Sequence, residues 1–103
     1  MTIEFSIERR KLQHLFKHAV DFGITGDWNN ETAEAFAEAI RHHINNPHVE
    51  IIAGRYRGIR EVTHFFDATT HLWAAIDTNS DLVAAWKLYP SQVQDLRHAG
   101  DVT

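Results

Sequence analysis

The chain contains no cysteine among its 103 residues and only two prolines. Disulfide bridges and cysteine-based zinc sites are therefore excluded, so the fold must be held by packing. No uncharged run approaches the roughly 18 apolar residues that a membrane span needs, and the segment MTIEFSIERRK does not have the order of a signal peptide. We therefore expect a soluble protein without a membrane partner.

An excess of positive charge is also lacking, since the net charge is −4. This balance disfavours indiscriminate binding to nucleic acids, which depends on the neutralisation of phosphates. The positive residues nevertheless gather in two segments, Arg9, Arg10, Lys11 and Lys17 in the first and Arg55, Arg57 and Arg60 in the second. Two local basic patches are thus expected on an acidic molecule.

The composition is that of a globular protein, with 44% apolar and 11% aromatic residues. A chain of this length supports one hydrophobic core, whereas two cores would each be marginal. No repeat, linker or low-complexity segment divides it. The sequence predicts a single domain over residues 1–103.

The first half of the chain predicts two helices. Apolar residues recur at helical spacing from about residue 6 to 22, and Gly23 suits the left-handed conformation that follows many helices. Asn29 or Asn30 is positioned to cap a second helix, which ends before Pro47. The predicted buried stripe of this helix is Ala33, Phe36, Ala37, Ile40 and Ile44.

After Pro47 the apolar period changes to two, which is typical of β-strands. Four strands are expected, near residues 49–56, 60–67, 71–77 and 82–89. Because short turns join them, the sheet should be antiparallel. A short C-terminal helix could follow Pro90, with Ser91 as its cap. Two helices followed by a four-stranded antiparallel sheet define an α+β fold.

Polar side chains of the first helix form one candidate site, composed of His14, Lys17, His18 and Asp21. At helical spacing these groups lie within reach of one another. Metal-free RNA cleavage needs a base for the 2′-hydroxyl, a cation for the phosphate and an acid for the departing 5′-oxygen, and histidine and lysine suit the first two roles. The alternative is an ordinary solvated helix face.

The i, i+4 spacing of His14 and His18 is also one that metal ligands use on a helix. The glutamate of an H-E-x-x-H motif is absent, however, and no cysteine cluster supports a zinc site. We therefore predict neither a metal ligand nor a cofactor.

A second candidate is the segment GRYRGIR, in which Arg55, Arg57 and Arg60 surround Tyr56 near a strand end. Guanidinium groups bind phosphates well, and an aromatic ring can stack on an unpaired base. The alternative is a solvated hairpin end with ordinary charged residues.

A third candidate is Trp86, which lies among small residues in the segment VAAWKL. Small neighbours leave space beside the indole, which a base can fill by stacking. The alternative is a tryptophan that simply belongs to the core. Trp28 and Trp73 carry no further signal.

Three segments in this order, LFKHAVDFGI, GRYRG and AAWKL, resemble the C-terminal nuclease domain of colicin D and related toxin tips of contact-dependent growth inhibition systems. The resemblance runs from about Leu12 to Leu88 and is strongest in KHAVDFG and in the last predicted strand. Short motifs mislead singly, but three in order carry more weight together.

The resemblance implies a metal-independent ribonuclease that cuts a transfer RNA in its anticodon loop and leaves a 2′,3′-cyclic phosphate and a 5′-hydroxyl. It also implies a fold related to the barnase, RelE and colicin nuclease architecture. A cognate immunity protein is the implied partner, with the chain a monomer or one half of a toxin–immunity heterodimer. Secretion as the C-terminal tip of a larger toxin, which acts in the cytoplasm of the target cell, is the implied localisation.

Carried over residue by residue, the resemblance gives His18 the role of catalytic base and Lys17 that of a phosphate-binding cation. Trp86 becomes a wall of the active site, and Lys87 beside it becomes a substrate contact together with the arginine segment. The hypothesis requires that His18, Trp86 and the arginine turn share one pocket.

Two positions differ from the family pattern, because this chain has Leu15 where the family has a lysine and Ala84 where it has a serine. Other groups would then supply the missing contacts: Thr63, His64 or an arginine of GRYRG. From the residues alone, a second class of function stays open, a non-catalytic RNA-binding or protein-interaction module that uses the same arginines and aromatic rings.

Overall fold

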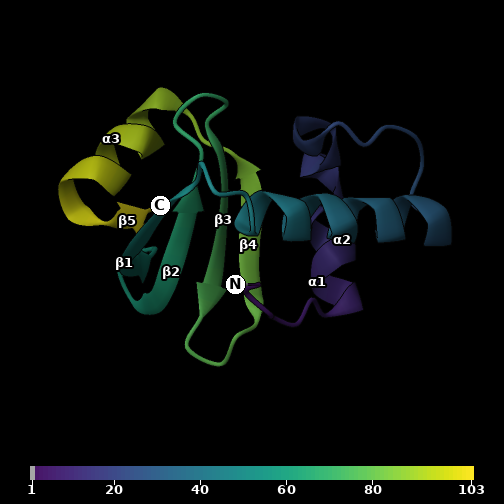
Figure 1. The fold of residues 1–103 in the computed structure, drawn as a ribbon, viewed down its shortest axis with the longest axis horizontal. Helices are drawn as coiled ribbons and strands as arrows, with labels where there is room; N and C mark the ends of the chain where they lie inside the picture. The colour runs from purple at the N-terminus through teal and green to yellow at the C-terminus, as the bar shows by residue number, and fades with distance from the viewer. Residues whose placement is uncertain (1) are drawn as a thin grey trace.

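The computed structural model describes residues 2–103, and within them the centre is a sheet of five strands in the order β4-β3-β2-β1-β5 (Figure 1). The strands are β1 (Glu50–Tyr56), β2 (Arg60–Phe66), β3 (Leu72–Asp77), β4 (Leu82–Lys87) and β5 (Asp101–Val102). The first four pair antiparallel, as predicted, and the α+β class is confirmed. The predicted number of strands was wrong by one, because β5 pairs in parallel with β1 and its two residues are too few to show an alternating pattern.

The first predicted helix is two elements rather than one. α1 (Arg9–Leu15) is an α-helix, but the chain then tightens into a 3₁₀ helix, η1 (Phe16–Phe22). Phe16, Ala19 and Phe22 are spaced by three, which matches the three residues per turn of a 3₁₀ helix. All three pack against the core, and the two phenylalanines contact the second helix edge-on.

α2 (Asn30–Ile44) begins where the sequence predicts. The Asn29 side chain accepts a hydrogen bond from the Thr32 backbone N–H at 2.9 Å, and the Thr32 hydroxyl accepts one from the Asn29 backbone N–H at 3.0 Å. This reciprocal pair satisfies two of the amides that a helix start leaves free. The predicted buried stripe is confirmed at all five positions, Ala33, Phe36, Ala37, Ile40 and Ile44.

α3 (Pro90–Ala99) confirms the predicted C-terminal helix but not its predicted cap. Tyr89 rather than Ser91 is the N-cap, because Pro90 occupies the first helical position, where its missing N–H loses no hydrogen bond. The Tyr89 backbone N–H donates to the Gln92 side chain at 2.9 Å. Figure 1 shows α3 beside β5, whereas α1 and α2 lie on the β4 side of the sheet.

Gly54 allows β5 to approach the sheet. The Gly100 carbonyl oxygen, just before β5, accepts a hydrogen bond from the Arg55 backbone N–H at 2.8 Å. A Cβ added to Gly54 would lie 1.9 Å from that oxygen, far inside van der Waals contact. The residue at position 54 must therefore be glycine for β1 and the turn into β5 to lie this close.

Two buried histidines make polar contacts inside the described part of the chain. The Nε2 atom of His43, on α2, lies 3.0 Å from the Phe65 carbonyl oxygen. The Nε2 atom of His64, on β2, lies 2.9 Å from the Gly100 carbonyl oxygen. Burial lowers the pKa of both imidazoles below the ordinary value, because a charged ring is poorly solvated in the core.

Gly54→Ala is expected to lower the free energy of unfolding by more than about 2 kcal/mol, because the new methyl group would collide with backbone atoms. Gly23→Ala is the matched control, since Gly23 has a φ of 81° but nothing lies within 4 Å of an added Cβ. The only cost is then that of an alanine in the left-handed conformation, which is about 1 kcal/mol. Urea denaturation measures both values, and equal losses would contradict the close contact at Gly54.

Stability should decrease on acidification. The unfolded chain binds protons at His43 and His64 below about pH 6.5, whereas the folded chain binds them only at a lower pH. Their stabilising contribution is therefore complete above this pH and is lost as the pH falls through it towards the lowered pKa values. Urea midpoints at several pH values measure the slope, and joint replacement by glutamine should flatten it. If the pH dependence of stability were unchanged in that variant, the two histidines would not be its cause.

Candidate active site

A cleft of about 720 Å³ lies between α1–η1 and one face of the sheet. Its lining comes from the two helical segments, the adjoining ends of β1 and β2 with the turn between them, β4, the residue that precedes β3, and the start of α3 with the residues before it. The side chains that carry charge or can exchange protons are Lys11, His14, Lys17, His18, Asp21, Tyr56, Arg57, Arg60, His71, Lys87 and Tyr89. Trp86 forms part of the wall.

His18 packs against Trp86 inside this cleft. The two ring centroids are 5.2 Å apart, with the planes tilted by 42°. Burial, reinforced by the positive charge of Lys17, holds the pKa of His18 below its ordinary value, while Asp21 acts in the opposite direction. The imidazole is therefore mainly neutral near pH 7, and in this form it can accept a proton.

Asp21 attaches η1 to the edge strand of the sheet. Its Oδ2 atom accepts a hydrogen bond from the Lys87 backbone N–H at 3.1 Å. Because His18 and Asp21 are three residues apart, they lie on the same side of a 3₁₀ helix. The hydrogen bond therefore holds His18 beside β4, the strand that carries Trp86.

Trp86 rests on a second indole, that of Trp73 on β3. The Trp73 ring is fully buried, and its centroid lies 4.8 Å from that of Trp86 and 5.9 Å from that of Tyr56. Tyr56 pairs with Arg60 at one end of the β1–β2 ladder, whereas Trp73 and Trp86 pair at the opposite end of β3 and β4. The twist of the sheet brings these distant ends together on one face.

Positive charge is concentrated in the cleft. Five of its lining side chains are lysine or arginine, and Asp21 is the one carboxylate among the described lining residues, although the whole chain has a net charge of −4. A concave surface that carries charge of one sign attracts ligands of the opposite sign. The cleft therefore suits a polyanion with phosphate groups.

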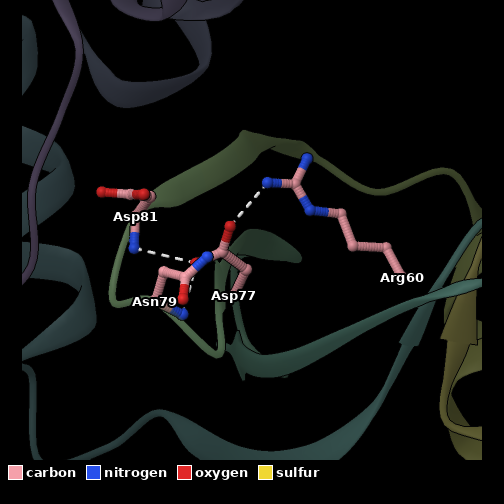
Figure 2. Close-up of polar contacts among 4 residues, drawn as sticks. All are labelled: Arg60, Asp77, Asn79 and Asp81. Carbon is pink, nitrogen blue, oxygen red and sulfur yellow. Dashed lines mark hydrogen bonds and ion pairs between the residues drawn. The ribbon is translucent and has the colours of Figure 1, made fainter.

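Arg60 is held at the edge of the cleft by an ion pair with Asp77, at the end of β3. Figure 2 shows that the same carboxylate also accepts the backbone N–H groups of Asn79 and Asp81, at 2.9 and 3.1 Å. Burial acts to raise the pKa of Asp77, but the Asp81 N–H, Arg60 and the Asn79 N–H together hold it below its usual value. The ion pair therefore fixes the position of Arg60 and neutralises part of its charge.

Seven of the predicted site residues line this cleft: Lys17, His18, Tyr56, Arg57, Arg60, Trp86 and Lys87. The guanidinium carbon of Arg57 lies 5.1 Å from the centre of the Tyr56 ring. The structure thus brings His18, Trp86 and the arginine turn into one pocket, as the single-site hypothesis requires.

Three predicted substrate contacts lie elsewhere. Arg55 and Thr63 are on the opposite face of the sheet from Trp86, because side chains alternate along a strand, and they line a separate groove. His64 is on the same face as Trp86 but is fully buried, with 0% exposure. The expectation that these three residues share the pocket of His18 and Trp86 is therefore corrected, since none of them lines the cleft.

Lys11 and His71 are among the cleft residues that sequence reasoning left out. Lys11 is three residues before His14 on α1, and this helical spacing is the signal that identifies it. His71 enters from the β2–β3 turn with a φ of 66°, and no sequence pattern indicates its position. Leu15 and Ala84, the two expected departures from the family pattern, are buried in the cleft wall.

Two kinds of feature are absent from residues 2–103. No group of three or more His, Asp or Glu side chains is arranged there to hold a metal ion. The spacing of His14 and His18 spans the change from α-helix to 3₁₀ helix, so these residues do not have the i, i+4 geometry of a regular α-helix. The same residues include no helix with both the length and the apolar character needed to cross a membrane.

Changes beside His18 should move its pKa in opposite directions. Lys17→Ala should raise it, because a positive neighbour disfavours the protonated ring. Asp21→Asn should lower it, while the amide oxygen still accepts the Lys87 N–H. Titration of the histidine rings by NMR measures both shifts, and the wild-type midpoint is expected below about 6.5. Shifts of the same sign would contradict this account.

Comparisons with known proteins agree with this geometry. The Colicin D family model matches residues 11–96, which include all the cleft residues named above. Colicin-D of Escherichia coli is 31% identical over 83 residues, which are 80% of this chain but only 12% of that protein. A solved structure, a ribonuclease from Escherichia coli complexed with its inhibitor protein, matches with a TM-score of 0.79 and 28% identity, covering 88% of this chain and 99% of that chain. This chain belongs to the colicin D family.

Proposed function

We propose that this chain is a ribonuclease toxin domain that cleaves a transfer RNA in its anticodon loop without a metal ion. The observation that carries the proposal is a half-buried His18 of lowered pKa, packed on Trp86 in a cleft with five cationic side chains. The structural neighbour is a ribonuclease, which supports the class of reaction. The transfer RNA and its anticodon loop follow from the family resemblance.

In this mechanism His18 is the general base. It removes the proton from the 2′-hydroxyl of the ribose on the 5′ side of the scissile bond, and the 2′-oxygen then attacks the phosphorus. As this bond forms, the bond to the 5′-oxygen breaks, which leaves a 2′,3′-cyclic phosphate and a 5′-hydroxyl. Lys17 and Arg57 stabilise the negative charge that develops on the phosphate oxygens.

The walls of the cleft orient the RNA. Trp86 and Tyr56 present aromatic rings to unpaired bases, which an anticodon loop supplies. Stacking of a base on such a ring contributes about 1–3 kcal/mol. Arg60 and Lys87 lie where they can contact the neighbouring phosphates.

The departing 5′-oxygen also needs a proton donor. Besides His18, the described imidazoles that line the cleft are His14, from α1, and His71, from the β2–β3 turn. We expect one of these two to act as the general acid. Separate replacement of each by alanine identifies it, because loss of the acid should slow cleavage by about 10²-fold or more.

The apolar residues Leu15 and Ala84 make no charged contact with a phosphate. We assign the missing contacts to Lys11 and Arg57, which line the same cleft. A different arrangement of cations should favour a different loop, so the transfer RNA cut by this chain need not be the one cut by its relatives.

A cognate immunity protein is the proposed partner. The structural neighbour is in complex with its inhibitor protein. An acidic surface on a partner of this chain would complement the cationic cleft and block RNA.

Because the matched region is 12% of colicin-D, we further propose that this domain is the C-terminal tip of a larger secreted toxin and acts in the cytoplasm of a target cell.

His18→Ala is expected to leave the fold intact and to reduce transfer RNA cleavage by at least about 10²-fold. Incubation with total transfer RNA in EDTA, followed by sequencing of the RNA ends, measures the rate and the position of the cut. His98→Ala is the matched control, because His98 is on α3 and does not line the cleft. Full activity of His18→Ala would remove this residue from the mechanism.

The same assay tests the alternative of a non-catalytic RNA-binding or protein-interaction module. That alternative predicts transfer RNA that is retarded on a gel yet intact, both in EDTA and with added Mg²⁺. Discrete cleavage in EDTA would exclude it.

A further inference from the structure

We propose that His64 is a positioning residue of the cleft, which fixes the Trp73 indole on which Trp86 and Tyr56 rest. The inference extends the proposed ribonuclease function to a residue that does not line the cleft.

The hydrogen bonds of His64 determine its tautomer. The Trp73 Nε1–H group can only donate, and it lies 3.0 Å from the Nδ1 atom of His64. Nδ1 must therefore lack a proton, so the neutral ring carries its proton on Nε2. That atom lies 2.9 Å from the Gly100 carbonyl oxygen and donates to it. His64 thus connects a core indole to the turn before β5 in one fixed orientation.

Burial makes both hydrogen bonds difficult to replace. His64 and Trp73 each have 0% exposure, so water does not reach the indole N–H or the imidazole. An unpaired polar group at such a site is strongly unfavourable. If the acceptor at position 64 were removed, the Trp73 indole would have to rotate or shift to find another partner.

Movement of the Trp73 indole would displace residues that line the cleft. Its ring centroid is 4.8 Å from that of Trp86, and Trp86 in turn lies 5.2 Å from His18. Tyr56 is nearly parallel to Trp73, with 28° between the planes at 5.9 Å. A rotated indole would therefore displace both aromatic rings that face the substrate, and with them the surface on which His18 packs.

The test compares His64→Leu, which removes both hydrogen bonds, with His64→Gln, whose amide offers one acceptor and one donor. His43→Leu is the matched control, because His43 is also a buried histidine bonded to a backbone carbonyl but does not line the cleft. Trp73→Phe is a second probe, which removes the other partner of the hydrogen bond and leaves a smaller aromatic ring in the core.

The first measurement is the NMR spectrum of the indole N–H groups and tyrosine rings, which does not depend on activity. His64→Leu and Trp73→Phe should both shift the Trp86 and Tyr56 signals, whereas His64→Gln and His43→Leu should leave them near their wild-type positions. Unmoved Trp86 and Tyr56 signals in folded His64→Leu would overturn the proposal. If this variant does not fold, the same result with Trp73→Phe would overturn it.

The second measurement is single-turnover cleavage of transfer RNA at a temperature at which each variant is folded. His64→Leu should be slower by about 10²-fold, as small displacements of catalytic groups produce, while His64→Gln should recover most of this loss. A purely structural role predicts equal rates for folded His64→Leu and His43→Leu, which would refute positioning. If the wild-type chain cleaves no RNA, the proposed function fails, and the NMR measurement still decides the role of His64.

Discussion

The contact of the Trp73 indole with Trp86 and Tyr56 is the interaction on which the cleft depends. Trp73 is fully buried in the core, yet both of its ring neighbours line the cleft. The same ring therefore contributes to the stability of the sheet and to the shape of the cleft surface. Because protein cores are close-packed, a change of volume near Trp73 is transmitted to the cleft rather than absorbed.

Charge is unevenly distributed between the cleft and the rest of the molecule. The chain has a net charge of −4, but the described lining of the cleft contains five cationic side chains and one carboxylate. The remaining surface must therefore carry an excess of negative charge. On such a surface a polyanion would be repelled over most of the area and attracted at the cleft, which would direct its approach.

The sequence predicted the elements well where local physics decides them. Asn29 caps α2 through its own side chain, and short turns with alternating apolar residues define the antiparallel strands. The cleft was only partly predictable. His18, Lys17 and Trp86 carry recognisable motifs, but the approach of Tyr56 to Trp73 arises from the coiling of the whole sheet. The burial of His64 and the cleft position of His71 likewise depend on long-range packing, which no local pattern encodes.

The three-residue repeat of η1 limits how this segment can vary among relatives. In a 3₁₀ helix one residue corresponds to a rotation of about 120°. An insertion or deletion between His18 and Asp21 would therefore turn one of them away from β4, whatever residue was added or removed. A substitution at Val20, which is 64% exposed, leaves the directions of the His18 and Asp21 side chains unchanged. The length of this segment is thus more strictly constrained than its composition.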